Sequence, residues 1–414
     1  MASIRMFVAA LAVTVGVAVT GIQGQTSDIF DPTVLHRVDL NLHSADWAKL
    51  KLNFQTNDYY PADLTWNGQT VRNVGIRSRG RGSRSGIKPG LRIDFDRYAV
   101  GQEYLGQKHL VLRNHTQDPS AIHENTAMWF YARMGVNAPR TAHARFYVNG
   151  EYSGLYTIVE EIDKKLLARL FGIIEADTQN DGYLFEYNWV DEWHGNYLGS
   201  ALDPYKLRFT AKTHENGTDE ALYRPIEELV RLFNDTPPAS FIPTVSDRLD
   251  LTQFVRYLAV QSFLAENDGW VGFWGVNNFF IYRLEGQVRH VFIAWDASEA
   301  FLAPNLPVEL RIDTNVLARK LLEIPQFRDT FIATLNEAAD VAAEIPAGST
   351  VGALETEIRR ELDLIDAAIR EDTLKPYTDD EFVREGNAMK QFASGRISFV
   401  KCEVDRMRGM VSSC

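Results

Sequence analysis

Residues 72–97 read RNVGIRSRGRGSRSGIKPGLRIDFDR, and this stretch is the most unusual part of the chain. Eight of its side chains are cationic and only two are acidic, although the whole chain has a net charge of −12. Five glycines separate the basic residues. Glycine lets backbone N–H groups approach an anion closely, and arginine matches phosphate oxygens with two parallel hydrogen bonds. A phosphate-binding loop and a solvated, arginine-rich hairpin both fit this pattern, which matches no formal nucleotide-binding motif.

Short apolar runs typical of strands lie on both sides of this stretch. They are residues 38–42, 71–78, 91–95, 110–112, 144–148 and 155–159. Asn149-Gly150 lies between the last two runs and readily takes positive φ, so it predicts a tight hairpin. One helix is expected among the strands over residues 120–134, with Asp118 as its N-cap and Pro119 at its first position.

The second half of the chain has a mostly helical pattern. Asp250 followed by Gln253 resembles a capping box and begins a helix that should run to about residue 265. Further amphipathic helices are expected over residues 316–322, 327–342 and 351–369.

A group of polar residues follows the helix that is expected to end near residue 265. It comprises Glu266-Asn267-Asp268, then Asn277-Asn278, and finally Asp296 at the end of an apolar strand. An acid at the end of a buried strand is poorly explained by packing and suits a divalent cation. Phosphoryl transfer uses one carboxylate to accept a hydroxyl proton, and another carboxylate with an amide to hold Mg²⁺. The alternative is a helix-end turn and a strand-end cap without chemistry.

The order of these features along the chain favours phosphoryl transfer. A basic, glycine-rich β-segment is followed by a basic residue near the next strand (Arg92 or Lys88) and by a helix that bears Glu124. Protein-kinase-like folds use this succession, in which the basic residue pairs with the helix glutamate. We therefore predict an α+β, two-lobed, protein-kinase-like fold. Its β-rich N-lobe would span residues 25–165, its mostly helical C-lobe residues 166–400, and a tail residues 401–414.

Composition and the chain ends bound the class of protein. The 414 residues are 24% charged and 45% hydrophobic, as in globular proteins. Arg5 and the apolar run over 6–19 predict a signal peptide at residues 1–24, and hence export, with an uncleaved anchor as the alternative. No later segment has the length of a membrane span. The acidic balance argues against nucleic-acid binding. Cys402 and Cys414 can close only a small local loop.

The sequence resembles the CotH kinase family, named for spore coat protein H. The matching stretches are residues 75–80 (GIRSRG), 88–95 (KPGLRIDF), 118–124 (DPSAIHE), 147–156 (YVNGEYSGLY) with Glu160 and Asp163, 266–268, 277–278 and 295–296. Two positions depart from the family pattern: Ser298 stands where members often have Asp, and Glu186 stands where a lysine is familiar.

The resemblance implies a secretory-type kinase that uses ATP with Mg²⁺ or Mn²⁺. It would transfer the γ-phosphoryl group to Ser or Thr hydroxyls of an extracytoplasmic, surface or coat protein. Matched by position, the resemblance implies a catalytic base at Asp268, metal ligands at Asn277 or Asn278 and at Asp296, a glutamate at Glu124 that pairs with Arg92 or Lys88, and nucleotide contacts at Arg79 and Gly80.

Two other functions remain open. One is a catalytically degenerate surface or adhesion protein that keeps the kinase fold for binding. The other is a glycosidase-like hydrolase with Asp268 and Asp296 as its acid pair, which requires carboxyl groups roughly 5–10 Å apart. The aromatic cluster of Trp270, Phe273 and Trp274 suits either stacking on a sugar or base, or covering a core. The oligomeric state is not indicated by the sequence.

Overall fold

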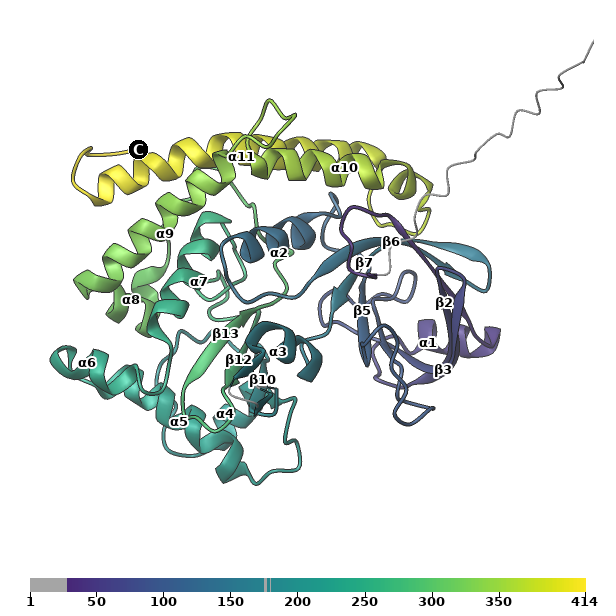
Figure 1. Ribbon diagram of the computed structural model, residues 1–414, viewed down its shortest axis with the longest axis horizontal. Helices are drawn as coiled ribbons and strands as arrows, with labels where there is room; N and C mark the ends of the chain where they lie inside the picture. Colours follow the sequence, from purple (N-terminus) through teal and green to yellow (C-terminus); the bar gives the residue numbers. More distant parts are fainter. Residues whose placement is uncertain (1–27, 175–176, 179) are drawn as a thin grey trace, which may run out of the picture.

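The structure is a computed structural model that describes residues 28–174, 177–178 and 180–414 (Figure 1). The expected signal peptide at residues 1–24 lies outside the described residues. Within the described ranges, no helix is both long enough and apolar enough to cross a membrane.

The first half of the described chain forms a closed barrel of seven strands in the order β1-β2-β3-β4-β5-β7-β6. The strands are His36–Asn41 (β1), Tyr60–Trp66 (β2), Gln69–Ser78 (β3), Leu91–Asp94 (β4), His109–Arg113 (β5), Thr141–Val148 (β6) and Glu151–Glu160 (β7). Strands β1 and β6 are parallel neighbours, and the other neighbouring pairs are antiparallel. All six expected strands are confirmed, and β2 was not expected. The barrel has its own buried apolar core and lies at the right of Figure 1.

The predicted hairpin is confirmed between β6 and β7. Asn149 and Gly150 have φ values of 52° and 84°, the positive values that a two-residue hairpin turn of this kind requires. The Asn149 Oδ1 atom also accepts a hydrogen bond from the Leu42 N–H at 2.9 Å, which fixes the turn against the end of β1.

Helices and a second sheet make up most of the remaining chain. The helices are Ser44–Leu52 (α1), His123–Arg133 (α2), Lys164–Phe171 (α3), Asp203–Arg208 (α4), Asp219–Asp235 (α5), Pro238–Val245 (α6), Leu251–Phe263 (α7), Val316–Leu322 (α8), Pro325–Ala343 (α9), Ala353–Glu371 (α10) and Asp379–Met407 (α11). The sheet has the order β11-β10-β12-β13 and consists of Phe209–Ala211 (β11), Tyr183–Tyr187 (β10), Phe279–Arg283 (β12) and His290–Ala294 (β13). A small ribbon pairs Ile173–Ile174 (β8) with Asp177–Thr178 (β9). The mixed α/β character predicted from the sequence is therefore confirmed.

Two predicted helix starts have different outcomes. The prediction at Asp118 is wrong: α2 begins at His123 after the N-cap residue Ile122, so Pro119 lies outside the helix. The Asp118 carboxylate instead accepts hydrogen bonds from the N–H groups of Ser120 and His123, and it shapes the turn before the helix. The prediction at Asp250 is confirmed, because its side chain accepts from the Gln253 N–H at 3.0 Å and caps α7.

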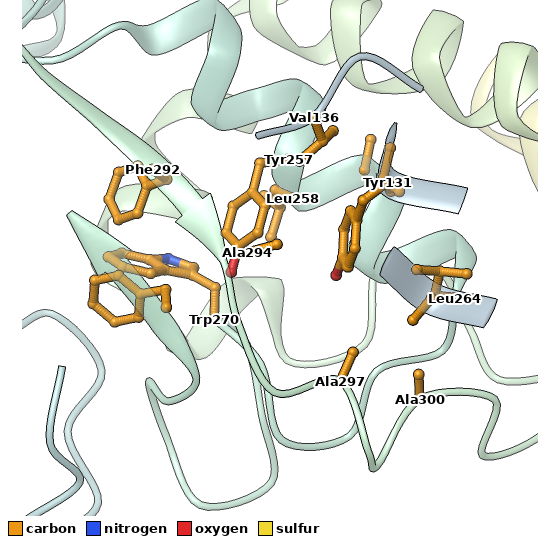
Figure 2. Close-up of a cluster of buried hydrophobic side chains, with 14 of the residues drawn as sticks. Tyr131, Val136, Tyr257, Leu258, Leu264, Trp270, Phe292, Ala294, Ala297 and Ala300 are labelled. Atoms are coloured by element: carbon orange, nitrogen blue, oxygen red, sulfur yellow. The ribbon is translucent and has the colours of Figure 1, made fainter. Parts of the chain in front are cut away.

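The main core lies between α7, α2 and the four-stranded sheet, and part of it is drawn in Figure 2. The Tyr257 ring stacks on Phe292 of β13 and on Tyr131 of α2, with ring centroids 6.0 and 6.2 Å apart. Trp270 is 4% exposed and donates its indole N–H to the Asn315 Oδ1 atom. Trp270 is therefore a core residue, and it fixes the loop that follows α7.

A buried ion pair joins the barrel to the C-terminal helices. The Lys88 Nζ atom lies 2.5 Å from the Asp372 Oδ2 atom, and the two side chains are 2% and 1% exposed. Asp372 follows α10, and its Oδ2 atom also accepts from the Leu155 N–H on β7. Gly154 makes room for this carboxylate, since a Cβ atom there would lie 2.6 Å from the Asp372 Cγ atom. We call these residues, Lys88, Gly154 and Asp372, the barrel lock.

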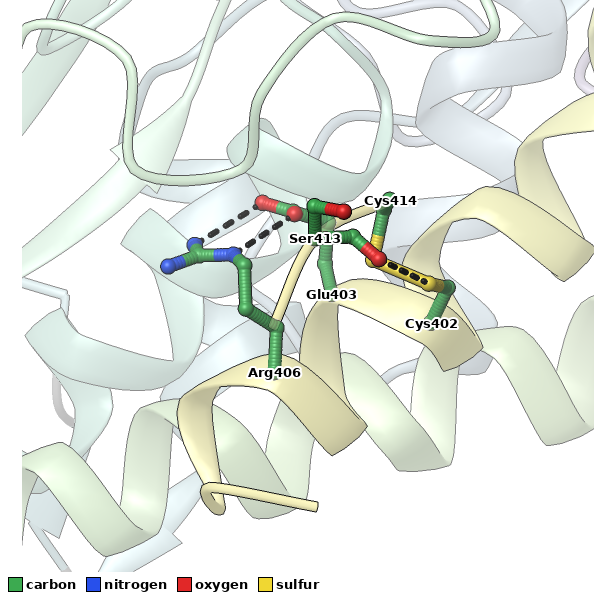
Figure 3. Close-up of a disulfide and its surroundings, with 5 residues drawn as sticks. All are labelled: Cys402, Glu403, Arg406, Ser413 and Cys414. Carbon is green, nitrogen blue, oxygen red and sulfur yellow. Dashed lines mark hydrogen bonds and ion pairs between the residues drawn. A yellow bond between two sulfur atoms is a disulfide. The ribbon is translucent and has the colours of Figure 1, made fainter. Parts of the chain in front are cut away.

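The C-terminal tail folds back on α11 (Figure 3). Cys402 of α11 and Cys414 form a disulfide across twelve residues, as the sequence predicts for a local loop. Arg406 lies between the two cysteines in sequence, and its guanidinium pairs with Glu403 and with Glu309 at 2.8 Å each.

Removal of one partner of the barrel lock should destabilise the protein strongly. Asp372→Ala leaves the Lys88 ammonium buried without a counter-ion, and breaking a buried pair in this way costs about 3–5 kcal/mol of unfolding free energy. Urea unfolding followed by circular dichroism measures the loss. Asp340→Ala is the matched control, because its pair with Lys401 is solvent-exposed and such pairs contribute about 0–1 kcal/mol. Equal losses in the two variants would contradict the assignment of the lock.

Candidate active site

A cleft of about 760 Å³ lies where the barrel meets the second sheet. The loop after β3, the ends of β5 and β7, the loop before β12 and the loop after β13 all contribute side chains to it. Seven of the nine site residues expected from the sequence line this cleft, namely Arg79, Gly80, Arg92, Asp268, Asn277, Asn278 and Asp296. Tertiary folding therefore brings together residues that are up to 217 positions apart in sequence.

Two asparagine amides hold the Asp268 carboxylate. The Asn277 Nδ2 atom lies 3.1 and 3.0 Å from the Asp268 Oδ1 and Oδ2 atoms. The Asn278 Nδ2 atom donates to the Asp268 Oδ2 atom at 2.9 Å and to its backbone carbonyl at 3.0 Å. Since both amides reach the carboxylate from the start of β12, its position is fixed relative to the second sheet.

The surroundings of Asp268 favour its protonated form more than water does. Burial raises the pKa of the Asp268 carboxyl above its ordinary value, and the negative charge of Asp296 adds to the increase. The hydrogen bonds from Asn277 and Asn278 oppose this rise only in part. A carboxylate with a raised pKa in a cleft is suited to take up a proton from a hydroxyl group.

Arg113, at the end of β5, connects two acids of the cleft region. Its guanidinium donates to the Asp296 Oδ2 atom at 2.7 Å and to the Glu124 Oε1 atom at 2.9 Å. Burial by itself raises the pKa of Asp296, but the charges of Arg113 and Arg79 outweigh burial and hold this pKa below its ordinary value. Asp296 is therefore ionised at neutral pH, whereas burial raises the pKa of Glu124.

The loops that carry these acids contain strained backbone. Ala265, Asn278 and Asp296 have φ values of 50°, 54° and 49°, in the left-handed region that favours glycine. Each such residue costs on the order of 1 kcal/mol or more, and it persists only where the surrounding structure enforces it. Strain at three positions beside the two acids marks this region as a candidate functional site.

Arg79 carries a positive charge that no carboxylate neutralises directly. It lies on the loop after β3, and among the described residues it forms no ion pair within 4.0 Å, while its guanidinium lies 5.6 Å from the centre of the Trp295 ring. Burial and the nearby charge of Arg113 lower the pKa of Arg79 to about 10, so it remains cationic at neutral pH. An anion in the cleft would relieve this unpaired charge.

Two further ion pairs line the cleft. Arg92 lies 3.3 Å from Glu161, and Lys212 lies 3.1 Å from Glu186. Burial by itself raises the pKa of Glu161, but Arg92 and Lys212 outweigh it and lower this pKa to about 2. The sequence has Glu186 where a lysine was expected from the family resemblance. Lys212, directly after β11, supplies a lysine at this place and pairs with Glu186.

The structure differs from the expected pairing of Glu124. Neither Lys88 nor Arg92 reaches Glu124, because Lys88 belongs to the barrel lock and Arg92 pairs with Glu161. Arg113 takes that place, and sequence reasoning missed it because the expected strand ended at residue 112. The period of two along β5 offered a signal, since Val111 and Arg113 share a face and Val111 is the register partner of Arg92.

The expected metal ligands are one carboxylate and two amides. Within the part of the chain that the structure describes, no group of three or more His, Cys, Asp and Glu side chains is placed to hold a metal ion. Asn277 and Asn278 use their Nδ2 atoms on Asp268, which leaves their Oδ1 atoms for a cation. Carboxylate and amide oxygens are the donors that Mg²⁺ prefers, so the residues present fit this ion chemically.

The aromatic cluster divides between core and cleft. Trp270 is buried, whereas Phe273 and Trp274 are 52% and 56% exposed. Trp274 lines the cleft, and its carbonyl accepts the indole N–H of Trp189, another lining residue, at 2.9 Å. Arg81 stacks on Trp189 and donates to its carbonyl, so the glycine-rich loop contacts this rim.

The chain is similar in sequence to a known protein family and to a known protein. The sequence model of the family described as CotH kinase protein matches residues 76–400. Inner spore coat protein H of Bacillus subtilis (strain 168) is 22% identical over 373 residues, which cover 87% of this chain and 95% of that protein.

Two solved structures are also similar. The Helicobacter pylori proinflammatory kinase CtkA has a TM-score of 0.33 at 10% identity, and the match covers 81% of this chain and 95% of CtkA. A chain from the Shewanella oneidensis MR-1 toxin–antitoxin complex of HipA, HipB and operator DNA has a TM-score of 0.34 at 12% identity, and the match covers 72% of this chain and 60% of the other.

Loss of Arg113 should make stability depend on pH in a specific direction. In the wild type the lowered pKa of Asp296 contributes stability that is present above about pH 4 and is lost as the pH falls below it. In Arg113→Met, burial dominates and the pKa values of Asp296 and Glu124 rise, so stability is lost as the pH increases. The difference in unfolding free energy between the two proteins should therefore widen from about pH 4 to about pH 7.

Urea unfolding at a series of pH values measures this difference. Arg133→Met is the control: Arg133 lies on α2, the helix that bears Glu124, and the variant removes an exposed pair with Glu344 after α9, so it should show a small gap that does not change with pH. A gap for Arg113→Met that is constant across the range would contradict the coupling of Arg113 to the two acids.

Proposed function

The chain belongs to the CotH kinase family, and on that premise we propose that it is a secreted protein kinase. It transfers the γ-phosphoryl group of ATP to Ser or Thr hydroxyls of an extracytoplasmic, surface or coat protein. The observation that carries this proposal is the content of one cleft: an amide-held Asp268, the ionised Asp296 and the unpaired guanidinium of Arg79.

Asp268 is proposed as the group that receives the proton of the acceptor hydroxyl. Its two amide partners fix its orientation, and its raised pKa brings it closer to the acidity that a general base needs near neutral pH. Asn277 and Asn278 thereby act on the carboxylate as well as offering oxygen atoms for a cation.

Asp296, with Asn277 or Asn278, is proposed to hold Mg²⁺ or Mn²⁺ in the complex with ATP. When bound, such an ion neutralises charge on the phosphate oxygens. The Ser298 hydroxyl donates to the Asp296 Oδ1 atom at 3.2 Å, so the residue that departs from the family pattern supports the carboxylate rather than adding a second one.

The phosphate-directed cations are proposed to be Arg79 and Arg113. Arg113 makes the ion pair with the helix glutamate that protein kinases use to orient their phosphate-binding lysine, and it lines the cleft. Gly80 has a φ of 104° and lets the backbone of the same loop come close to the phosphates. Arg92 lines the cleft, and we keep it as a residue that contacts the nucleotide. Lys88 is not among the proposed nucleotide contacts, because it is buried in the barrel lock.

The two-lobed arrangement is also part of the proposal. The barrel with α2 would serve as the N-lobe and carry the phosphate-binding arginines, and the second sheet with α7 would serve as the C-lobe and carry the acids. The expected boundary at residue 165 falls at the start of α3, directly after the last barrel strand. The name of the Bacillus relative, an inner spore coat protein, supports a coat or surface acceptor.

One observation favours a second function, a protein that binds through the kinase fold without catalysis. Both Asp296 carboxylate oxygens already accept hydrogen bonds, from Arg113 and from Ser298, and the positive charge of Arg113 offsets part of the negative charge that would attract a metal ion. A metal ion would have to share this carboxylate with Arg113. Nucleotide binding and phosphoryl transfer therefore need separate tests.

ATP with Mg²⁺ or Mn²⁺ should raise the melting temperature of residues 25–414. A ligand that binds only the folded state stabilises it, by about 2.7 kcal/mol when its concentration is a hundredfold above Kd. Arg79→Met should reduce this shift, because the variant loses the unpaired cation of the cleft. The matched control is Arg72→Met, which removes an exposed cation from the same basic stretch outside the cleft. If millimolar nucleotide leaves the wild-type melting temperature unchanged, nucleotide binding is rejected.

Asp268→Asn should abolish transfer while nucleotide binding is kept. Loss of a general base lowers rates by about 10²–10⁴-fold, and asparagine can still accept hydrogen bonds from Asn277 and Asn278. Incorporation of labelled phosphate into the protein itself or into a serine-rich acceptor measures the activity. Asp247→Asn, an exposed acid outside the cleft, should transfer at the wild-type rate. Full activity in Asp268→Asn would refute the assigned base, and an inactive wild type that still binds ATP would favour the binding-only function.

A further inference from the structure

We infer that Arg396, on the C-terminal helix α11, is a positioning residue that holds the two acid-bearing loops of the cleft in register from outside the cleft. The inference rests on the proposed function for its catalytic meaning, although the contacts themselves do not depend on it. Arg396 touches none of the residues assigned to chemistry, so any effect it has on the reaction passes through the backbone.

All the hydrogen bonds of the Arg396 guanidinium in the described chain go to backbone carbonyls. Its Nε atom donates to the Phe263 carbonyl at 2.8 Å, and Nη2 donates to the Ser262 carbonyl. Its Nη1 atom donates to the carbonyls of Pro304 and Leu306 at 3.0 and 2.5 Å. One planar group thus joins the last turn of α7 to the loop that follows β13.

These two segments carry the acids of the cleft. Asp268 follows the end of α7 by five residues, and Asp296 precedes the 304–306 segment by eight. A second connection lies between Arg396 and the acids, because the Phe301 N–H donates to the Leu264 carbonyl at 2.7 Å. The Asn267 N–H then donates to the Glu299 carbonyl at 3.2 Å. The two loops therefore run side by side, and Arg396 closes the outer end of this ladder.

The chemistry of the position requires an arginine. Arg396 is 0% exposed, and no carboxylate lies within ion-pair distance of it in the described chain. The carbonyls at the end of α7 carry the negative end of the helix dipole, which a cation stabilises. Only a guanidinium has enough donors in a fixed plane to satisfy four carbonyls on two segments at once.

Helix α11 is packed closely enough to transmit this constraint. Gly395, the preceding residue, allows contact with the second loop, since a Cβ atom there would lie 3.0 Å from the Pro304 Cβ atom. Phe392, one turn earlier, packs edge-to-face on Phe301 with ring centroids 5.1 Å apart. Farther along the helix, Arg406 pairs with Glu309 just beyond the same loop. Residues from three different turns of α11 thus contact the 301–309 region.

A purely structural role would also predict that Arg396 variants are unstable, so the test needs a readout that stability alone does not change. Arg396→Met keeps the volume of the side chain and removes all four hydrogen bonds. Val400→Ala is the matched control: Val400 is 0% exposed on the same helix, and its truncation destabilises the core without removing a loop contact.

The first measurement is hydrogen exchange of the two loops in the full chain, well below the melting temperature of both variants. Arg396→Met should raise exchange of the amides of Asn267, Asp268 and Phe301 at least tenfold, and Val400→Ala should raise it no more than threefold. This measurement needs no activity, so it decides the inference even if the proposed kinase function fails. Equal loop exchange in the two variants would overturn the inference.

The second measurement is phosphoryl transfer. Arg396→Met should lower kcat at least tenfold and leave the KM for ATP within twofold, because the acids are displaced while the phosphate-binding arginines are not. Millimolar guanidinium ion should restore part of the lost kcat in Arg396→Ala and none in Val400→Ala. A kcat for Arg396→Met that falls no further than that of Val400→Ala would overturn the inference.

Discussion

The ion pairs of Arg113 hold the three parts of the site together. Arg113 projects from the barrel, Glu124 from α2, and Asp296 from the end of the second sheet. Each partner is at least partly buried, and a buried charge without a counter-ion costs several kcal/mol. The two carboxylates and the guanidinium are therefore each stable only in the presence of the others. The ionised state of Asp296 follows from this constraint.

The barrel lock also joins the barrel to the rest of the protein, in this case to the C-terminal helices. Tyr156 lies with its ring 5.0 Å from the Lys88 Nζ atom, and Gly154 makes room for Asp372. Both belong to the YVNGEYSGLY stretch of residues 147–156, and the Tyr152 hydroxyl of that stretch donates to the Ala368 carbonyl on α10. One of the stretches that carry the family resemblance thus builds the joint between barrel and helices, while others, residues 266–268, 277–278 and 295–296, contribute acids and amides to the cleft.

Much of the candidate site was predictable because its residues have local causes. Asp268 follows a helix whose cap at Asp250 is visible in the sequence, and Asp296 ends an apolar run, so both acids could be placed at the ends of elements. Arg113 had only the period of two along β5 as a signal, because its role depends on partners 11 and 183 positions away. Lys88 was assigned to phosphate by its residue type and its place beside glycines. Its burial against Asp372, 284 positions away, could not be read from the sequence.

The sequence by itself determined six of the seven barrel strands, the turn at Asn149-Gly150, the acids and amides of the cleft, and the membership of a family, because these depend on neighbours within a few residues or on matched motifs. Only the tertiary structure decided which cation meets which acid. Of the eight basic residues in 72–97, one is locked in the interior and another is left unpaired in the cleft. An ion pair depends on distance and burial, and both are fixed only when the barrel, the sheet and the C-terminal helices have packed together.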